Sequence, residues 1–225
     1  MVKPLVLVLT GGPCGGKSTA LARLGKLFAS RFGDITAYLG PEVATIMQSS
    51  GCRYPGTGPD KAAELLAFER SILQVQLSIE DSFKNIAAAS APARKTVVLL
   101  DRCAFDLVAY IGDDESGGGS ELWRQTMAGV SPAQSEASLL ARYDHVLFLQ
   151  SAANGASEHY NLHNAARTES LEEARAMDAK TRRVFDARFG DRLHVFENGA
   201  AGGFEGKMQA VEACVDARIR AHFGL

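Results

Sequence analysis

The sequence predicts a single α/β domain in which helices cover both faces of a five-stranded parallel sheet. Five short, β-prone and mainly apolar runs recur along the 225 residues, and each is followed by a segment with helical character. Strands without polar alternation that alternate with helices are typical of parallel sheets with right-handed crossovers, because both faces of such a sheet are buried. We therefore expect a three-layer architecture that uses the whole of residues 1–225.

The first half of the chain contains three of the expected strands, at residues 5–9, 35–39 and 96–100. Leucines at helical spacing predict a helix over residues 18–30. Pro41 suits the start of a helix, so residues 42–48 are expected to begin one. A long helix is expected from Asp60, which can act as an N-cap, to about residue 89, where Pro92 breaks the pattern.

The second half contains the other two expected strands, at residues 145–149 and 193–196. A helical stretch is expected through residue 110. Residues 113–120 include three consecutive glycines and are expected to form a loop. Two shorter helical patterns precede the fourth strand, and a charged helix is expected over about 171–189. The last helix carries a repeating apolar face, made of Phe204, Met208, Val211, Val215 and Ile219.

The composition narrows the class of protein. The chain is 46% hydrophobic and 22% charged, as is usual for a globular domain. Its 24 basic and 26 acidic side chains nearly balance, so charge gives no reason to expect nucleic acid as the main partner. No apolar run approaches the ~20 residues of a membrane-spanning helix. The four cysteines lack C-x-x-C spacing and are expected to be reduced thiols in a cytoplasmic protein.

The most specific motif is the glycine-rich segment 11–18, which matches G-x-x-x-x-G-K-[ST] and lies between an expected strand and an expected helix. Its glycines let backbone N–H groups point at phosphate oxygens, next to the positive end of a helix dipole. Lys17 is expected to bind β- and γ-phosphates, and the Ser18 hydroxyl to bind Mg²⁺. ATP or GTP is therefore expected to bind at Gly12, Pro13, Cys14, Gly15, Gly16, Lys17, Ser18 and Thr19.

Two acidic residues follow the ends of expected strands, where parallel sheets bind ligands. Asp101 occupies the Walker B position and is expected to hold Mg²⁺ through water, or else to cap the next helix. Glu42 can accept a proton from a hydroxyl that attacks the γ-phosphate, or can simply sit at a helix N-terminus. Arg102 either binds a substrate phosphate or hydroxyl or pairs with a neighbouring acid. Asp106 and Tyr110 follow it at steps of four.

A lid is expected at about residues 151–170, between the fourth strand and the next helix. Phosphoryl transfer commonly recruits an arginine that closes over the transferring group, and Arg167 lies in this segment. Arg175, Arg182 and Arg183 compete for that role, but runs of charge on a helix usually form a solvated face.

Asn198 follows the fifth strand and is expected to contact the nucleotide base. No N-K-x-D element occurs in the chain, so the guanine-specific device of Ras-like GTPases is missing. Adenine and guanine therefore both stay open.

Together these motifs resemble the NadR/translocation-defect-type P-loop family of AAA-like ATPase and kinase domains. The resemblance spans about residues 4–208 and rests on segments 9–19, 41–45, 101–102, 143–146, 160–161 and 167–169 and on Asn198. It implies a kinase-like fold related to nucleoside and thymidylate kinases, with Glu42 as the base and Arg167 in the lid.

One branch of this family, the kinase domain of NadR, phosphorylates nicotinamide riboside with ATP. Another branch, known from photoreceptor channel trafficking, binds GTP. The chain carries no recognisable nicotinamide adenylyltransferase module, which argues against a NadR-like physiological role.

Three functions remain to be separated. The leading hypothesis is a small-molecule kinase that transfers the γ-phosphoryl group to a hydroxyl of an unidentified, nucleoside-like acceptor. The second is a nucleotide-gated regulatory module that binds a protein or lipid partner and hydrolyses nucleotide slowly; it needs Lys17 and Ser18 but not Glu42. The third is a P-loop fold that binds no nucleotide.

Overall fold

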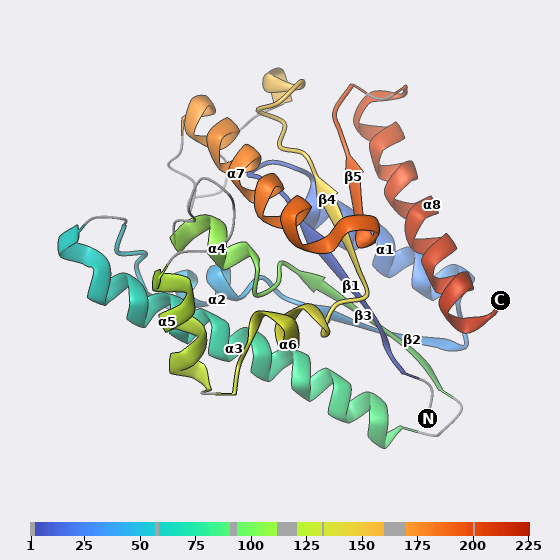
Figure 1. The fold of residues 1–225 in the computed structure, drawn as a ribbon. Helices are drawn as coiled ribbons and strands as arrows, with labels where there is room; N and C mark the ends of the chain where they lie inside the picture. Colours follow the sequence, from blue (N-terminus) through green and yellow to red (C-terminus); the bar gives the residue numbers. More distant parts are fainter. Residues whose placement is uncertain are drawn as a thin grey trace.

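The computed structural model describes residues 3–56, 59–90, 94–111, 121–131, 133–159, 170–199 and 201–225. In this part of the chain one sheet of five strands forms, in the order β2-β3-β1-β4-β5, and every neighbouring pair is parallel (Figure 1). The strands are β1 (Leu5–Thr10), β2 (Ile35–Gly40), β3 (Lys95–Asp101), β4 (His145–Leu149) and β5 (Leu193–Phe196). The expected five-stranded parallel sheet is confirmed.

The helices of the described ranges are α1 (Lys17–Arg31), α2 (Val43–Ser49), α3 (Ala62–Ala89), α4 (Asp106–Ile111), α5 (Glu121–Val130), α6 (Glu136–Leu140), α7 (Leu171–Phe189) and α8 (Gly203–Phe223). Short 3-10 turns lie at Pro59–Lys61, Ser157–His159 and Gly190–Arg192. The expectation that Asp60 caps α3 is wrong, because the 3-10 turn places Lys61 at the N-cap and no side chain bonds there.

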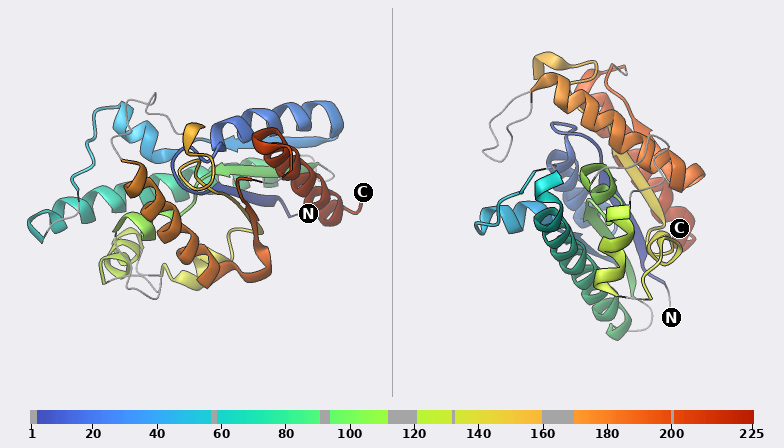
Figure 2. Two further views of the ribbon diagram at one scale, coloured as in Figure 1. Left: turned by 90° about the horizontal axis from the view of Figure 1, so that it is seen from above. Right: turned by 60° about the vertical axis from the view of Figure 1, so that its left-hand side comes forward.

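Alternation along the central strand separates the two outer layers. Leu5, Leu7 and Leu9 pack in one apolar cluster with α1 and α8. Val6 and Val8 point the other way and pack with α3, α4, α5 and α7. Figure 2 shows these helix groups on opposite sides of the sheet. Both faces of the sheet are therefore buried, which explains why the strands read as uninterrupted apolar runs.

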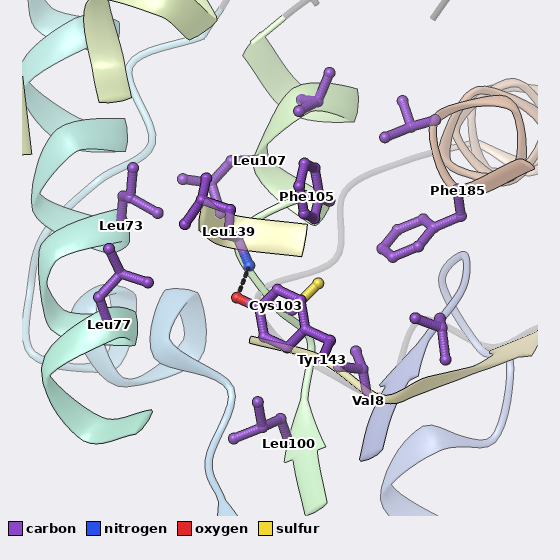
Figure 3. Packing of buried hydrophobic residues seen from close by; sticks show 14 of the residues in the cluster. Val8, Leu73, Leu77, Leu100, Cys103, Phe105, Leu107, Leu139, Tyr143 and Phe185 are labelled. Atoms are coloured by element: carbon purple, nitrogen blue, oxygen red, sulfur yellow. Dashed lines mark hydrogen bonds between the residues drawn. The ribbon is translucent and has the colours of Figure 1, made fainter. Parts of the chain in front are cut away.

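An aromatic cluster fixes the segment between β3 and α4. Phe105 is fully buried and lies edge-on to Phe189, with ring centroids 5.5 Å apart. The Tyr143 hydroxyl accepts a hydrogen bond from the N–H of Ala104 at 3.2 Å (Figure 3). The same hydroxyl donates a hydrogen bond to Glu80 at 2.9 Å. Because the segment is held by packing and hydrogen bonds together, the residues just before it are held as well.

The carboxyl ends of the strands meet at one edge of the sheet. Leu9 of β1 is in register with Asp101 of β3, and Gly40 of β2 is in register with Leu100. The glycine-rich loop therefore emerges beside the residues that follow β2 and β3. None of the helices in the described ranges combines the length and the apolarity needed to cross a membrane.

Candidate nucleotide and acceptor site

A cavity of about 2040 Å³ opens at this edge of the sheet. Its walls include residues 13–19 of the glycine-rich loop, Glu42, Asp101, Arg102 and Asn198. All of these were expected from the sequence to belong to the site. Gly12 is not among the lining residues, and Arg167 lies outside the described residues. Pro13 and Asn198, which are 185 positions apart in the sequence, thus line the same cavity.

The loop folds around the side chain of its own lysine. The Lys17 ammonium donates hydrogen bonds to the carbonyls of Gly11 and Gly12, at 3.0 Å each. Gly16 has a φ of 92°, which favours glycine, and a Cβ on Gly15 would lie 2.5 Å from the Leu149 carbonyl oxygen. Burial and then repulsion from Arg102 lower the pKa of Lys17 to about 8. The geometry is that of an anion-binding loop at the start of α1.

Asp101 presents a buried carboxylate oxygen that nothing in the described part of the chain satisfies. The residue is 8% exposed, and its Oδ1 has no hydrogen-bond partner there. Burial raises its pKa to about 6. No N–H of α4 bonds to Asp101, whereas Asp106, the first residue of α4, accepts the N–H of Cys103 at 2.9 Å. A lone carboxylate oxygen in one cavity with the Ser18 hydroxyl is a donor set that suits Mg²⁺, which usually keeps several waters.

Arg102 pairs with neighbouring acids, which is one of the two roles expected for it. Its Nε donates to Glu42 Oε1 at 2.5 Å, and its Nη1 donates to Asp106 Oδ1 at 3.0 Å. The guanidinium also lies over the Tyr110 ring, 5.7 Å from its centroid. The backbone of Arg102 adopts a φ of 70°, a strained value for a residue with a side chain, and its N–H donates to the Leu9 carbonyl.

Glu42 is held as a carboxylate by this pairing. Burial by itself would raise its pKa, but Arg102, the Thr45 hydroxyl and Lys17 outweigh burial and bring the pKa to about 2. Thr45 donates to Glu42 Oε2 at 2.5 Å. Such a carboxylate is ionised at neutral pH and can accept a hydrogen bond from a hydroxyl. It is a weak base, since general bases work best with a pKa near the operating pH.

Beyond Glu42 the cavity continues along α3 into a polar and aromatic region. Its walls there include Tyr54, Phe68, Glu69, Gln76 and Tyr110. The rings of Tyr54 and Phe68 meet edge-on with centroids 5.8 Å apart, and the Tyr54 hydroxyl donates to the Tyr110 carbonyl at 3.4 Å. The sequence motifs single out only Tyr110 among these residues, because it follows Arg102 at steps of four.

Comparison with known proteins decides the family. A family model described as "AAA domain" matches residues 6–199. The chain belongs to this family. The family resemblance inferred from the motifs is confirmed, and a comparison with curated proteins gives no match.

Three solved structures share the fold of this AAA domain. NadR in complex with NR gives a TM-score of 0.55 at 17% identity, over 99% of this chain and 52% of that one, so the chain spans about half the length of NadR. Deoxyadenosine kinase from M. mycoides with bound dATP gives 0.54 at 12% identity, over 94% and 99% of the two chains. Thymidylate kinase from Ehrlichia chaffeensis gives 0.53 at 14%, over 96% and 98%. The fold is therefore that of the P-loop kinases.

One buried carboxylate that fastens the P-loop of this AAA domain was missed from the sequence. Asp178 of α7 is 3% exposed, and its Oδ1 accepts the N–H groups of Gly12 at 2.9 Å and Ser151 at 3.0 Å. Its Oδ2 accepts from the Asn154 amide at 2.7 Å. A signal existed, because Asp178 falls on the same helical face as buried Ala174 and Phe185. A charge at a core position needs partners.

A buried lysine of α8 holds the other side of the loop. Lys207 is 2% exposed, and its Nζ donates to the carbonyls of Gly15 at 3.1 Å and Gln150 at 2.7 Å and to Asn198 Oδ1 at 3.0 Å. Burial lowers its pKa to about 8. The Asn198 amide in turn donates to the Ser151 and Asn154 carbonyls, at 2.7 Å each. The side chain of Asn198 thus joins loops, and its contact with a nucleotide base stays a prediction.

Of the expected lid, residues 151–159 and 170 are described, and Arg167 lies outside the described residues. The arginines that compete with it lie on α7. Arg175 donates to the Ala153 carbonyl at 2.7 Å, and Arg182 pairs with Asp186 at 2.8 Å. Arg183 lines the cavity. Within the described part of α7, Arg183 is therefore the arginine best placed to meet a phosphate.

Proposed function

We propose that this protein is a Mg²⁺-dependent phosphotransferase that moves the γ-phosphoryl group of ATP or GTP to a hydroxyl of a nucleoside-like small molecule. The observation that carries the proposal is the continuity of one cavity from the P-loop, past Glu42 and Arg102, into a region walled by aromatic and polar side chains. A protein that only bound nucleoside triphosphate would have no need of this second region. The likeness in fold to deoxyadenosine and thymidylate kinases supports the same reading.

The chain's own residues would divide the reaction among them. The P-loop N–H groups and Lys17 would hold the β- and γ-phosphates, and Ser18 and Asp101 would hold Mg²⁺, which when bound neutralises phosphate charge. The acceptor oxygen would attack the γ-phosphorus while the bond to the β,γ-bridging oxygen breaks, releasing the diphosphate. Glu42 would orient the acceptor hydroxyl and receive its proton, and Arg102 would hold Glu42 in place through their 2.5 Å bond.

A transfer assay with ATP and GTP over a panel of nucleosides tests this function. Glu42→Gln keeps the shape of the side chain but cannot take the proton, so we expect kcat to fall about 10²- to 10⁴-fold while nucleotide affinity holds. Glu64→Gln is the matched control, because Glu64 lies on α3 with its side chain 64% exposed. Wild-type transfer by Glu42→Gln, or no transfer by the wild type to any nucleoside, would refute the proposal.

The alternative function is a nucleotide-gated regulatory module. It is favoured by one observation: Glu42 is committed to Arg102 and Thr45 and has a pKa of about 2, so it is a poor base. Acceptor-independent hydrolysis that is slow in both wild type and Glu42→Gln, together with partner binding that changes between triphosphate and diphosphate, would support this second function.

A further inference from the structure

Glu69 of α3 is a largely buried residue whose carboxyl group bonds to none of the residues that the structure describes. The residue is 3% exposed, and no described residue donates a hydrogen bond to it or pairs with it. It belongs to the wall of the cavity that also contains the P-loop. Burial raises its pKa to about 8, so the group is mostly protonated at neutral pH.

The other buried glutamate of α3, Glu80, has the hydrogen-bond partners expected of a carboxylate that stabilises the fold. Glu80 is 1% exposed, and it accepts hydrogen bonds from Gln76 at 3.0 Å, Tyr143 at 2.9 Å and Arg142 at 2.5 Å. Glu69 has none of these although both face the core side of α3. The carboxyl oxygens of Glu69 are not among the fully buried atoms without a partner, so they reach the cavity, where a ligand can meet them.

The surroundings of Glu69 suit a flat ligand. Tyr54 lies close enough that the charge of Glu69, after burial, helps to raise the tyrosine pKa to about 12. Tyr54 and Phe68 present aromatic rings to the same cavity. Aromatic rings of this kind favour stacked or edge-on contact with another planar ring.

The position of Glu69 along α3 indicates how a ligand would be oriented in the cavity. Gln76 lies two turns further along the helix, about 10 Å along its axis. Its Nε2 donates to Glu80 and to the Arg102 carbonyl at 3.5 Å, and no described group donates to its Oε1. Arg102 in turn contacts Glu42. A molecule whose hydroxyl meets Glu42 can therefore extend past Gln76 and bring its far end to Glu69.

We propose that Glu69 recognises the phosphate acceptor, and that the acceptor bears an uncharged planar ring with a hydrogen-bond donor and acceptor side by side at the end remote from its reacting hydroxyl. A neutral carboxyl offers one O–H donor and one carbonyl acceptor next to each other, which matches such an edge. The ligand's role as phosphate acceptor rests on the proposed kinase function, whereas its binding does not.

Titration calorimetry measures nucleoside binding separately from phosphoryl transfer. The wild-type protein is saturated with Mg²⁺ and a non-hydrolysable ATP analogue, or the GTP analogue, and titrated with adenosine, guanosine, cytidine, uridine and the cationic nicotinamide riboside. We expect at least one uncharged nucleoside to bind. Glu69→Gln keeps a donor and an acceptor and should bind within about fivefold of wild type. Glu69→Leu loses both and should bind about 10- to 100-fold more weakly, with unchanged nucleotide affinity.

The control is Glu64→Gln, and melting curves check that each variant folds. Equal nucleoside binding by Glu69→Leu and wild type would overturn the inference, and so would a wild type that binds none of the five nucleosides. If nicotinamide riboside is the only one of the five that binds, and Glu69→Gln abolishes that binding, the inference that the acceptor's ring is uncharged is wrong. Uncharged nucleosides that bind through Glu69 but are never phosphorylated would support this inference and refute the proposed function instead.

Discussion

Replacing Asp178 tests how the P-loop is held in shape. Asp178→Ala removes the acceptor of two backbone N–H groups, those of Gly12 and Ser151, and of the Asn154 amide. Hydrogen bonds to a charged group contribute about 1.5–3 kcal/mol each, and the site is 97% buried, so screening by water is small. Allowing for relaxation and for water entering the gap, we expect the free energy of unfolding to fall by about 4 kcal/mol.

A graded series makes the reasoning refutable. For a chain of this length about 4 kcal/mol corresponds to a fall in Tm of roughly 12 °C, measurable by circular dichroism or calorimetry. Asp178→Asn keeps one neutral acceptor oxygen and should lose about half as much. Asp186→Ala is the control on the same helix, because among the described residues Asp186 pairs only with Arg182, at the surface, and we expect a change within about 0.5 kcal/mol. If Asp178→Ala unfolds at the same temperature as Asp186→Ala, the three hydrogen bonds do not hold the loop.

Three further predictions concern ligands and pH. Lys17→Met should weaken triphosphate binding at least about 100-fold in calorimetry, while Lys26→Met on the exposed side of α1 should not. Phe204→Ala should weaken it about tenfold, because that exposed ring lies against Gly16 and can stack on a base; unchanged affinity places the base elsewhere. The pKa of Glu69 is about 8 in the fold against 4.5 normally, so wild-type stability should fall by at most about 5 kcal/mol from pH 4.5 to 8 in urea titrations, and Glu69→Gln should flatten that slope.

The sheet and the P-loop could be read from the sequence because each depends on local pattern. Continuous apolar runs predicted the strands within two residues at each end, and the glycine-lysine-serine motif marked the turn between β1 and α1. Helix α3 shows where local pattern stops being sufficient. Ile86 follows Ile72 and Ile79 at steps of seven and so continues an apolar face of α3, but it is 53% exposed near the end of the helix.

Arg102 illustrates a question that the sequence posed and left open. Its two expected roles, binding substrate or pairing with an acid, could not be separated locally, since its partner Glu42 is 60 residues away in the chain. The parallel register of β2 and β3 brings the two together at the same edge of the sheet. The ion pair is thus a consequence of strand pairing, which a local pattern does not specify.

The sequence by itself determined the architecture, the phosphate-binding loop and the residues around it, because period, propensity and a short motif act over neighbouring positions. Only the tertiary structure decided which charges are buried. Asp178 and Lys207 bond to Gly12 and Gly15 across 166 and 192 residues, and no local pattern specifies those partners. Glu69 likewise became a candidate recognition group only once α3 was seen to form a wall of the cavity. The physical reason is that desolvation depends on what packs over a side chain, and that is set by contacts distant in sequence.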